Sequence, residues 1–130
     1  MFTTVRSPSA HSFDSPYSPA IRYRDLLAIS GQVAVDSAGA LVGEGDIEAQ
    51  ARQVFRNIGA LLAEAGLTFR IVFFLRYYLT NMDDWPVVAR IRPEFLHEPY
   101  PAAANLEVRR LVRPEWLIEI EAMAAFGSDE

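Results

Sequence analysis

The sequence contains no cysteine and no lysine, and it has only two histidines, His11 and His97. Without cysteine the chain has no disulfide, no thiolate nucleophile and no thiolate metal site. All twelve basic residues are arginine, which excludes a lysine Schiff base with a carbonyl substrate or with pyridoxal phosphate. The two histidines stand in dissimilar contexts and do not predict a histidine metal cluster. We therefore expect neither a metal nor a cofactor.

Long hydrophobic runs are also missing from the chain. No apolar run approaches the roughly 20 residues that a membrane helix needs. The first eight residues lack the apolar core of a signal peptide. The net charge is −5, and no segregated basic patch is visible that would hold a phosphate backbone. We therefore expect a cytoplasmic protein with no nucleic-acid partner and no membrane partner.

The composition that is present is that of one globular domain. The chain has 130 residues, of which 51% are hydrophobic and 22% are charged. That length can bury roughly two-thirds of the surface of the unfolded chain, which is enough for one core. Residues 1–16 are rich in Ser and Pro and show little periodicity. We expect a flexible lead-in over 1–16 and a single domain over 17–130.

Hydrophobic periodicity predicts five strands and two helices. The helix over 47–65 has an apolar stripe at helical spacing, with Asp46 as a candidate N-cap and Gly66 as a stop signal. Gln50 and Asn57 are among the polar residues of this helix that fall mostly off the stripe. The predicted order is β-β-α-β-α-β-β, with strands at 20–24, 26–34, 69–80, 104–111 and 117–126 and a second helix at 85–96 that Pro93 must kink or shorten.

Two helices can cover only one face of such a sheet. In the strand over 69–80, alternation places Phe73, Leu75 and Tyr77 on one face. The opposite face is partly apolar, with Phe74 and Tyr78 among its residues. The simplest cover for that face is a second copy of the chain, so the sequence predicts an α+β domain that forms a homo-oligomer.

Four short segments carry a resemblance to a known family. They are PYSPA at 16–20, ISGQV at 29–33, PAAANLEV at 101–108 and LIEIEAMA at 117–124. In their order and spacing they resemble the RidA/YjgF family of L-PSP-like enamine and imine deaminases over about 17–125. The resemblance implies a chorismate-mutase-like fold and a homotrimer whose sheets line a central barrel, with ligand clefts between subunits. Some members are described as ribonucleases, and the acidic charge speaks against that activity here.

The sequence departs from the family at Ala103. Deaminases of the family have an arginine at this position, and its planar guanidinium binds the substrate carboxylate in a bidentate fashion. Losing it should cost on the order of 3 kcal/mol, about a hundredfold in affinity for a carboxylate. Asn105 faces the same way and offers a hydrogen bond without a charge. Arg76 either restores a positive charge from another direction or forms an ion pair with Glu107, Glu119 or Glu121.

Three further residues match site positions of the family. Glu119 matches the glutamate that holds the substrate or the attacking water; otherwise it is a structural partner of a neighbouring arginine. Gly31 matches the glycine whose backbone faces the ligand, and a glycine within a strand also indicates a β-bulge or a close approach of the backbone. Tyr17 matches an aromatic residue at the rim of the cleft; otherwise it packs the N-terminal segment. We expect Glu121 and Glu107 to form structural pairs.

Two functions remain open on the sequence alone. The first is a hydrolase of the RidA type that acts on an enamine or imine in an intersubunit cleft, with a specificity altered by Ala103. In that case Glu119 orients water, and backbone groups near Gly31 bind the polar end of a larger or neutral substrate. The second is a non-catalytic trimer that binds a small metabolite or another protein.

Overall fold

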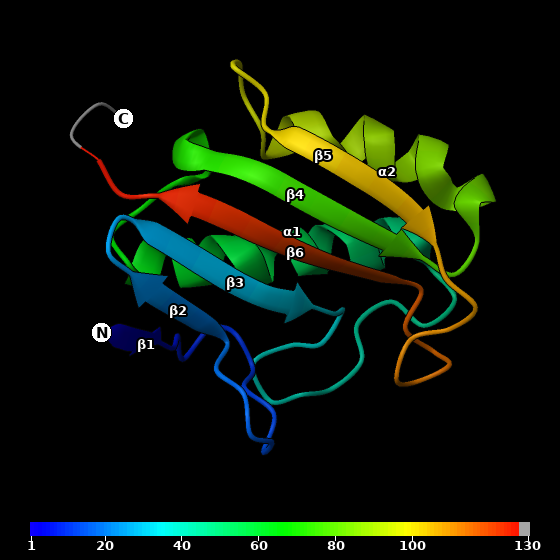
Figure 1. Cartoon of the computed structure of the whole chain (residues 1–130). Coiled ribbons are helices and arrows are strands. Elements are labelled where there is room, and N and C mark those ends of the chain that lie inside the picture. Colours follow the sequence, from blue (N-terminus) through cyan, green and yellow to red (C-terminus); the bar gives the residue numbers. More distant parts are fainter. Residues whose placement is uncertain (128–130) are drawn as a thin grey trace.

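The computed structural model describes residues 1–127, and Figure 1 shows one sheet with helices packed against it. The chain follows the order β-β-β-α-β-α-β-β, with three short 3-10 helices at Phe69–Ile71, Met82–Asp84 and Arg92–Glu94. The strands are β1 (Phe2–Val5), β2 (Ala20–Tyr23), β3 (Leu26–Gln32), β4 (Val72–Leu79), β5 (Ala102–Glu107) and β6 (Ile118–Ala125), and the helices are α1 (Ile47–Glu64) and α2 (Trp85–Ile91).

The sheet has six strands in the order β1-β2-β3-β6-β4-β5. Only β4 and β5 run parallel, and the stretch that joins them contains α2, as a parallel crossover requires. Helix α1 contacts β3 and β6 on one face of the sheet, and α2 packs beside α1 on that same side (Figure 1). The predicted α+β class with helices on one face is confirmed. The face without helices is called the open face below.

The N-terminal segment differs from the sequence-based expectation. Residues 1–16 were expected to be a flexible lead-in, but Phe2–Val5 forms the edge strand β1, antiparallel to β2. The strand is only four residues long and almost wholly exposed, so it shows no burial period in the sequence. Its β-branched residues favour extended backbone, and hydrogen bonds along the β2 edge hold it in place.

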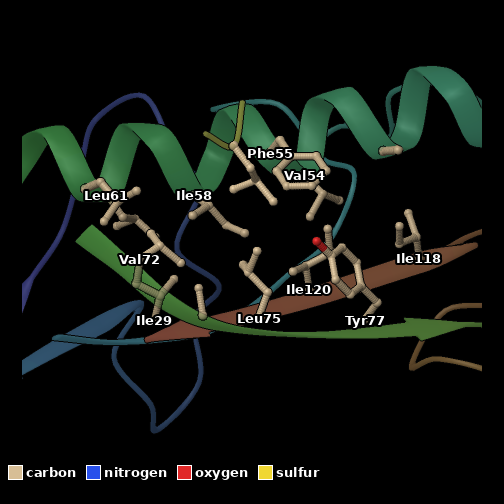
Figure 2. Close-up of a cluster of buried hydrophobic side chains, with 14 of the residues drawn as sticks. Ile29, Val54, Phe55, Ile58, Leu61, Val72, Leu75, Tyr77, Ile118 and Ile120 are labelled. Carbon is tan, nitrogen blue, oxygen red and sulfur yellow. The ribbon is translucent and has the colours of Figure 1, made fainter. Parts of the chain in front are cut away.

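The core lies between α1 and the sheet. Figure 2 shows the apolar stripe of α1, with Phe55, Ile58 and Leu61, above side chains of β4 and β6. Phe55 and Ile58 are fully buried, and each buried side chain of this size stabilises the fold by about 1.5–3 kcal/mol. Asp46 caps α1 as predicted, because its carboxylate accepts a hydrogen bond of 3.1 Å from the Ala49 N–H.

Two polar residues of α1 lie in this core, contrary to the sequence-based expectation. Gln50 and Asn57 were placed mostly off the buried stripe, yet they are 0% and 1% exposed. The Gln50 amide donates to the carbonyls of Gly43 and Glu115 and accepts from the Leu117 N–H. These bonds to distant backbone groups offset the cost of burying the amide, which no local pattern could indicate.

Strand β4 also departs from strict alternation. Its pairing with β6 shifts register between Val72 and Phe74, which marks a bulge. As a result Val72 is buried, while Phe73 is 43% exposed. The prediction that Phe73 shares the buried face of Leu75 is therefore wrong. After this bulge the alternation holds, with Tyr77 buried toward the helices.

Pro93 lies just beyond the end of α2, so this proline shortens the predicted helix. Within residues 1–127 no helix is long and apolar enough to span a membrane.

Candidate functional site

Gly31 lies at a second bulge, on β3 where it pairs with the central strand β6. Ile29 pairs with Ala122, but Gln32 pairs with Ile120, so two residues of β3 oppose one residue of β6. A Cβ atom at Gly31 would lie 2.7 Å from Cδ and 2.9 Å from Cγ of Glu119. Glycine therefore lets the backbone of β3 approach the Glu119 side chain. The structure shows both the bulge and the close approach that the sequence indicated.

Glu119 projects from β6 onto the open face and is half-buried. Burial raises the pKa of its carboxyl group, and the neighbouring Glu121 raises it further. No hydrogen bond or ion pair from residues 1–127 reaches the carboxylate. The carboxylate is thus desolvated but unpaired, and its more basic oxygens can accept a proton.

The segment around Tyr17 lies beside the bulge. The Ser30 hydroxyl donates a 2.6 Å hydrogen bond to the Ser18 carbonyl, and the Ser30 N–H donates to the Pro19 carbonyl at 2.9 Å. Tyr17 is 37% exposed, and its hydroxyl accepts a 3.2 Å hydrogen bond from the Phe13 N–H. These bonds bring Tyr17 into the neighbourhood of Gly31 and leave much of its ring accessible.

Arg76 lies on the open face of β4, where it forms an ion pair with Glu121. The Tyr78 hydroxyl donates to the same carboxylate at 3.0 Å, and the Arg76 guanidinium lies 4.9 Å from the centre of the Phe74 ring. The hydrogen bond that Arg76 donates to Glu121 raises the pKa of Arg76. Of the two alternatives for Arg76, the structure shows the ion pair. Glu107 has a local role, since it accepts a hydrogen bond from the Met82 N–H at 2.8 Å.

Ala103 lies on the other face of the sheet. Strand β5 aligns Ala103 with Leu75 and Asn105 with Tyr77, and residues paired in this way share a face. Leu75 and Tyr77 are both fully buried toward the helices. Ala103 and Asn105 therefore lie on the helix side of the edge strand, opposite the face that carries Arg76.

A cavity of about 330 Å³ opens beside Ala103 and is called the Ala103 cavity below. Its walls come from β4, from α2 and the turn that follows it, and from the approach to β5. Apolar residues make up most of the wall, but Tyr77 and Arg92 add polar groups. The lining residues are Leu75, Tyr77, Ala89, Arg92, Pro93, Leu96, Tyr100, Pro101 and Ala103.

Tyr77 and Arg92 have unusual environments. The Tyr77 hydroxyl and the Arg92 Nε are both buried, and neither has a hydrogen-bond partner in the described part of the chain. Burial raises the pKa of Tyr77 to about 12, and the nearby Arg92 guanidinium partly opposes that rise. Figure 2 shows the Tyr77 hydroxyl on the helix side of the sheet.

The sequence analysis did not identify Arg92 or Tyr77 as site residues. A local signal for Arg92 exists: it follows Val88 by four positions and Trp85 by seven, and this spacing places it on the buried face of α2. Its guanidinium lies over the Trp85 ring, 4.8 Å from the ring centre. No such signal exists for the unpaired hydroxyl of Tyr77, because pairing depends on residues distant in the sequence.

The predicted site residues thus fall into two groups. Glu119 lies against Gly31 on the open face, with the segment of Tyr17 beside the bulge. Ala103 belongs to the cavity on the helix side. One chain does not bring these two groups into a common pocket. Among residues 1–127 no group of three or more His, Cys, Asp or Glu side chains is placed to hold a metal ion.

Comparison with known proteins gives consistent matches over nearly the whole chain. Residues 8–126 match the family model described as Endoribonuclease L-PSP. A RutC family protein of Pyrococcus horikoshii is 39% identical over 109 residues, which cover 84% of this chain and 86% of that protein. The 2-iminobutanoate/2-iminopropanoate deaminase of Mus musculus is 35% identical over 128 residues, which cover 98% of this chain and 91% of that protein.

Solved structures share the architecture. A protein of the conserved Rid family from Yersinia pestis superimposes with a TM-score of 0.91 at 33% identity. The match covers 96% of this chain and 99% of that chain. The similarity therefore extends over nearly the whole fold.

Proposed function

The chain belongs to the RidA/YjgF family, and from that premise we propose that it hydrolyses an imine or an enamine in a cleft between subunits. In the imine reaction, water adds to the carbon of the C=N bond. The carbinolamine then expels ammonia and leaves a carbonyl product. An enamine enters the same route once it has tautomerised to its imine. The reaction needs no cofactor, only a group that handles protons and a site that orients the substrate.

The observation that carries this proposal is the state of Glu119. The carboxylate lies directly against Gly31, its pKa is raised by burial, and no residue among 1–127 occupies its oxygens. A general base works best when its pKa approaches the operating pH, because it must both accept and return a proton. Glu119 would take a proton from the attacking water and deliver one to the departing nitrogen.

A second subunit would complete the cleft. Glu119 and Ala103 lie on opposite faces of the sheet, so one copy cannot present both to a single ligand. Ala103 lies on the edge strand β5, whereas Glu119 lies on the central strand. Apposition of the edge of one copy to the bulge of another would bring the two groups together. A homotrimer, as the family resemblance implies, satisfies this requirement.

Substrate choice would differ from that of the mouse relative, whose name specifies 2-iminobutanoate and 2-iminopropanoate. Alanine at position 103 supplies neither charge nor hydrogen bond and leaves room in the cavity. Small imino acids would lose a bidentate contact worth on the order of 3 kcal/mol. A larger imine that fills the Ala103 cavity would recover binding energy through apolar contacts.

A panel of imines tests this function directly. An amino-acid oxidase generates each imine in place from amino acids that range from alanine to phenylalanine, and decay of the imine is followed with and without the protein. We expect acceleration for bulky side chains and little for alanine. Binding of the corresponding carbonyl products without acceleration of any imine would instead support a non-catalytic metabolite-binding trimer.

A further inference from the structure

Tyr77 and Arg92 line the Ala103 cavity, and each contributes a buried polar atom that has no hydrogen-bond partner among residues 1–127. The Tyr77 hydroxyl and the Arg92 Nε are buried without a hydrogen-bond partner in residues 1–127, and Tyr77 is 0% exposed. The large majority of buried side-chain polar atoms in folded proteins have a hydrogen-bond partner, so two neighbouring exceptions require an explanation. Both groups can donate a hydrogen bond, and one of them carries a positive charge.

Arg92 is also held in place without being neutralised. Its guanidinium lies 4.8 Å from the centre of the Trp85 ring, and that ring lies 5.2 Å from the Tyr77 ring. Within the described chain Arg92 forms no ion pair, whereas Arg52, Arg76 and Arg90 each do. A half-buried guanidinium in an apolar-walled cavity strongly favours an anion, because the low dielectric strengthens their attraction.

We propose that the Ala103 cavity is a carboxylate-binding site in which Arg92, from the turn after α2, supplies the positive charge that Ala103 cannot. This inference rests on the proposed function and specifies its substrate class: an imino acid whose carboxylate passes Ala103 and reaches Arg92, with its apolar part against the wall at Leu75 and Leu96. Tyr77 is a positioning residue near the guanidinium, and its hydroxyl can donate to the same carboxylate or to a bridging water.

Arg76 does not fit this role. It lies on the opposite face of the sheet and is already paired with Glu121. A charge committed to one carboxylate binds a second one only weakly. Arg92 has the right face, an uncommitted charge and a place in the cavity wall.

The test measures binding of stable product analogues, so it does not depend on turnover. The probes are 2-oxobutanoate and 2-oxohexanoate, each compared with its neutral methyl ester by titration calorimetry. We expect the acids to bind at least about tenfold more tightly than the esters, the ratio that one charge-assisted contact provides. Arg92→Met should weaken acid binding by about ten- to a hundredfold and leave ester binding unchanged.

Arg90→Met is the matched control, because it removes the same charge two residues away and outside the cavity. It should leave the affinity for the acids unchanged. Tyr77→Phe deletes only the unpaired hydroxyl, so it should melt at the same temperature as the wild type or higher while binding the acids several-fold more weakly. If Arg92→Met fails to fold, Tyr77→Phe still decides the matter.

Equal binding of acid and ester, or equal losses in Arg92→Met and Arg90→Met, would overturn the inference. Its failure is distinguishable from failure of the proposed function. Binding of acids that depends on Arg92, without turnover of any imine, would retain the carboxylate site and reject the hydrolase. Turnover that depends on Glu119, together with acid binding that does not change in Arg92→Met, would retain the hydrolase and reject the carboxylate site.

Discussion

Glu119 carries a half-buried carboxylate that forms no ion pair with any residue among 1–127. Its raised pKa means that the ionised form destabilises the folded state. The cost is absent where the carboxyl group is protonated in both folded and unfolded chains, and it appears as the pH rises above the ordinary value of 4.5 and through the folded-state pKa. Above the folded-state pKa the folded protein bears this cost in full.

Glu119→Gln therefore separates activity from stability. We expect turnover to fall by about 10²- to 10⁴-fold, because the base is lost. The variant should melt above the wild type at pH 7 and at the same temperature below about pH 4, where both side chains are neutral. Rates on a bulky imine and melting curves across this pH range provide the check.

Glu121→Gln is the comparison: losing the partner of Arg76 should lower stability by about 0.2–1 kcal/mol. Full activity of Glu119→Gln would reject the catalytic assignment.

Ala103→Arg tests what the small side chain does. A guanidinium at the mouth of the cavity should raise kcat/KM for the imine from alanine by about tenfold or more. Ala103→Met fills the same space without charge and should not raise it. If the wild type already hydrolyses this small imine rapidly, the position is not the determinant of specificity that we propose.

At the scale of elements, the bulge of β3 and the side chain of Glu119 form one unit. A methyl group at Gly31 would overlap the carboxylate, which is the end of a flexible side chain and can move aside. We expect Gly31→Ala to cost about 1 kcal/mol or less in stability but to reduce turnover strongly. The double variant with Glu119→Gln should be no slower than Glu119→Gln alone. If the double variant instead loses the product of the two single rate reductions, Gly31 acts independently of Glu119.

Gln50 links α1 to the loops before it and before β6. Gln50→Leu roughly preserves the side-chain volume but leaves the Glu115 carbonyl and the Leu117 N–H without partners, whereas the Gly43 carbonyl keeps its hydrogen bond from the Asp46 N–H. We expect a loss of about 3 kcal/mol in the free energy of unfolding. Denaturant titration measures it, with the exposed Arg56→Gln on the same helix as control. A loss below that of the control would mean that water replaces the amide at no cost.

The elements that could be predicted from sequence are those with a strong period. Helix α1 and its Asp46 cap follow from the apolar stripe, and β6 follows from the alternation of Ile118, Glu119 and Ile120. Strand β1 was missed because only Val5 at its end is partly buried, so the strand shows no burial period. The exposure of Phe73 was missed because a bulge shifts the alternation by one residue. Bulges depend on cross-strand pairing, which is not encoded in any local period.

At the scale of the whole molecule, the open face and the divided site both point to assembly. We expect light scattering to give three times the chain mass of 14.6 kDa in dilute solution. Leu106 is 40% exposed on the open face of β5, beside Tyr78. Leu106→Asp should leave the single chain folded, shift the mass to one copy and abolish turnover together with the cleft. A wild-type monomer that hydrolyses imines would contradict the intersubunit cleft.

The family and the general placement of Glu119 and Gly31 could be inferred from four short segments of sequence. The proposed role of Arg92 could not, since its unpaired state appears only when α2, β4 and β5 surround one cavity. The faces of Ala103 and Arg76 required the register between strands. Sequence patterns thus identify candidate site residues, whereas strand pairing and register determine which of those side chains remain free to contact a ligand.

The central position of β6 also bears on how the chain acquires its structure during synthesis. Strands β3 and β4 both pair with β6, so Leu26 must wait for Ala125 to emerge before that pair can form. Contacts so distant in sequence slow folding, because a long loop closes before they are gained. Until residues 118–125 leave the ribosome, the nascent chain presents two unpaired apolar strand edges. In that interval a neighbouring nascent chain can compete with the chain's own last strand.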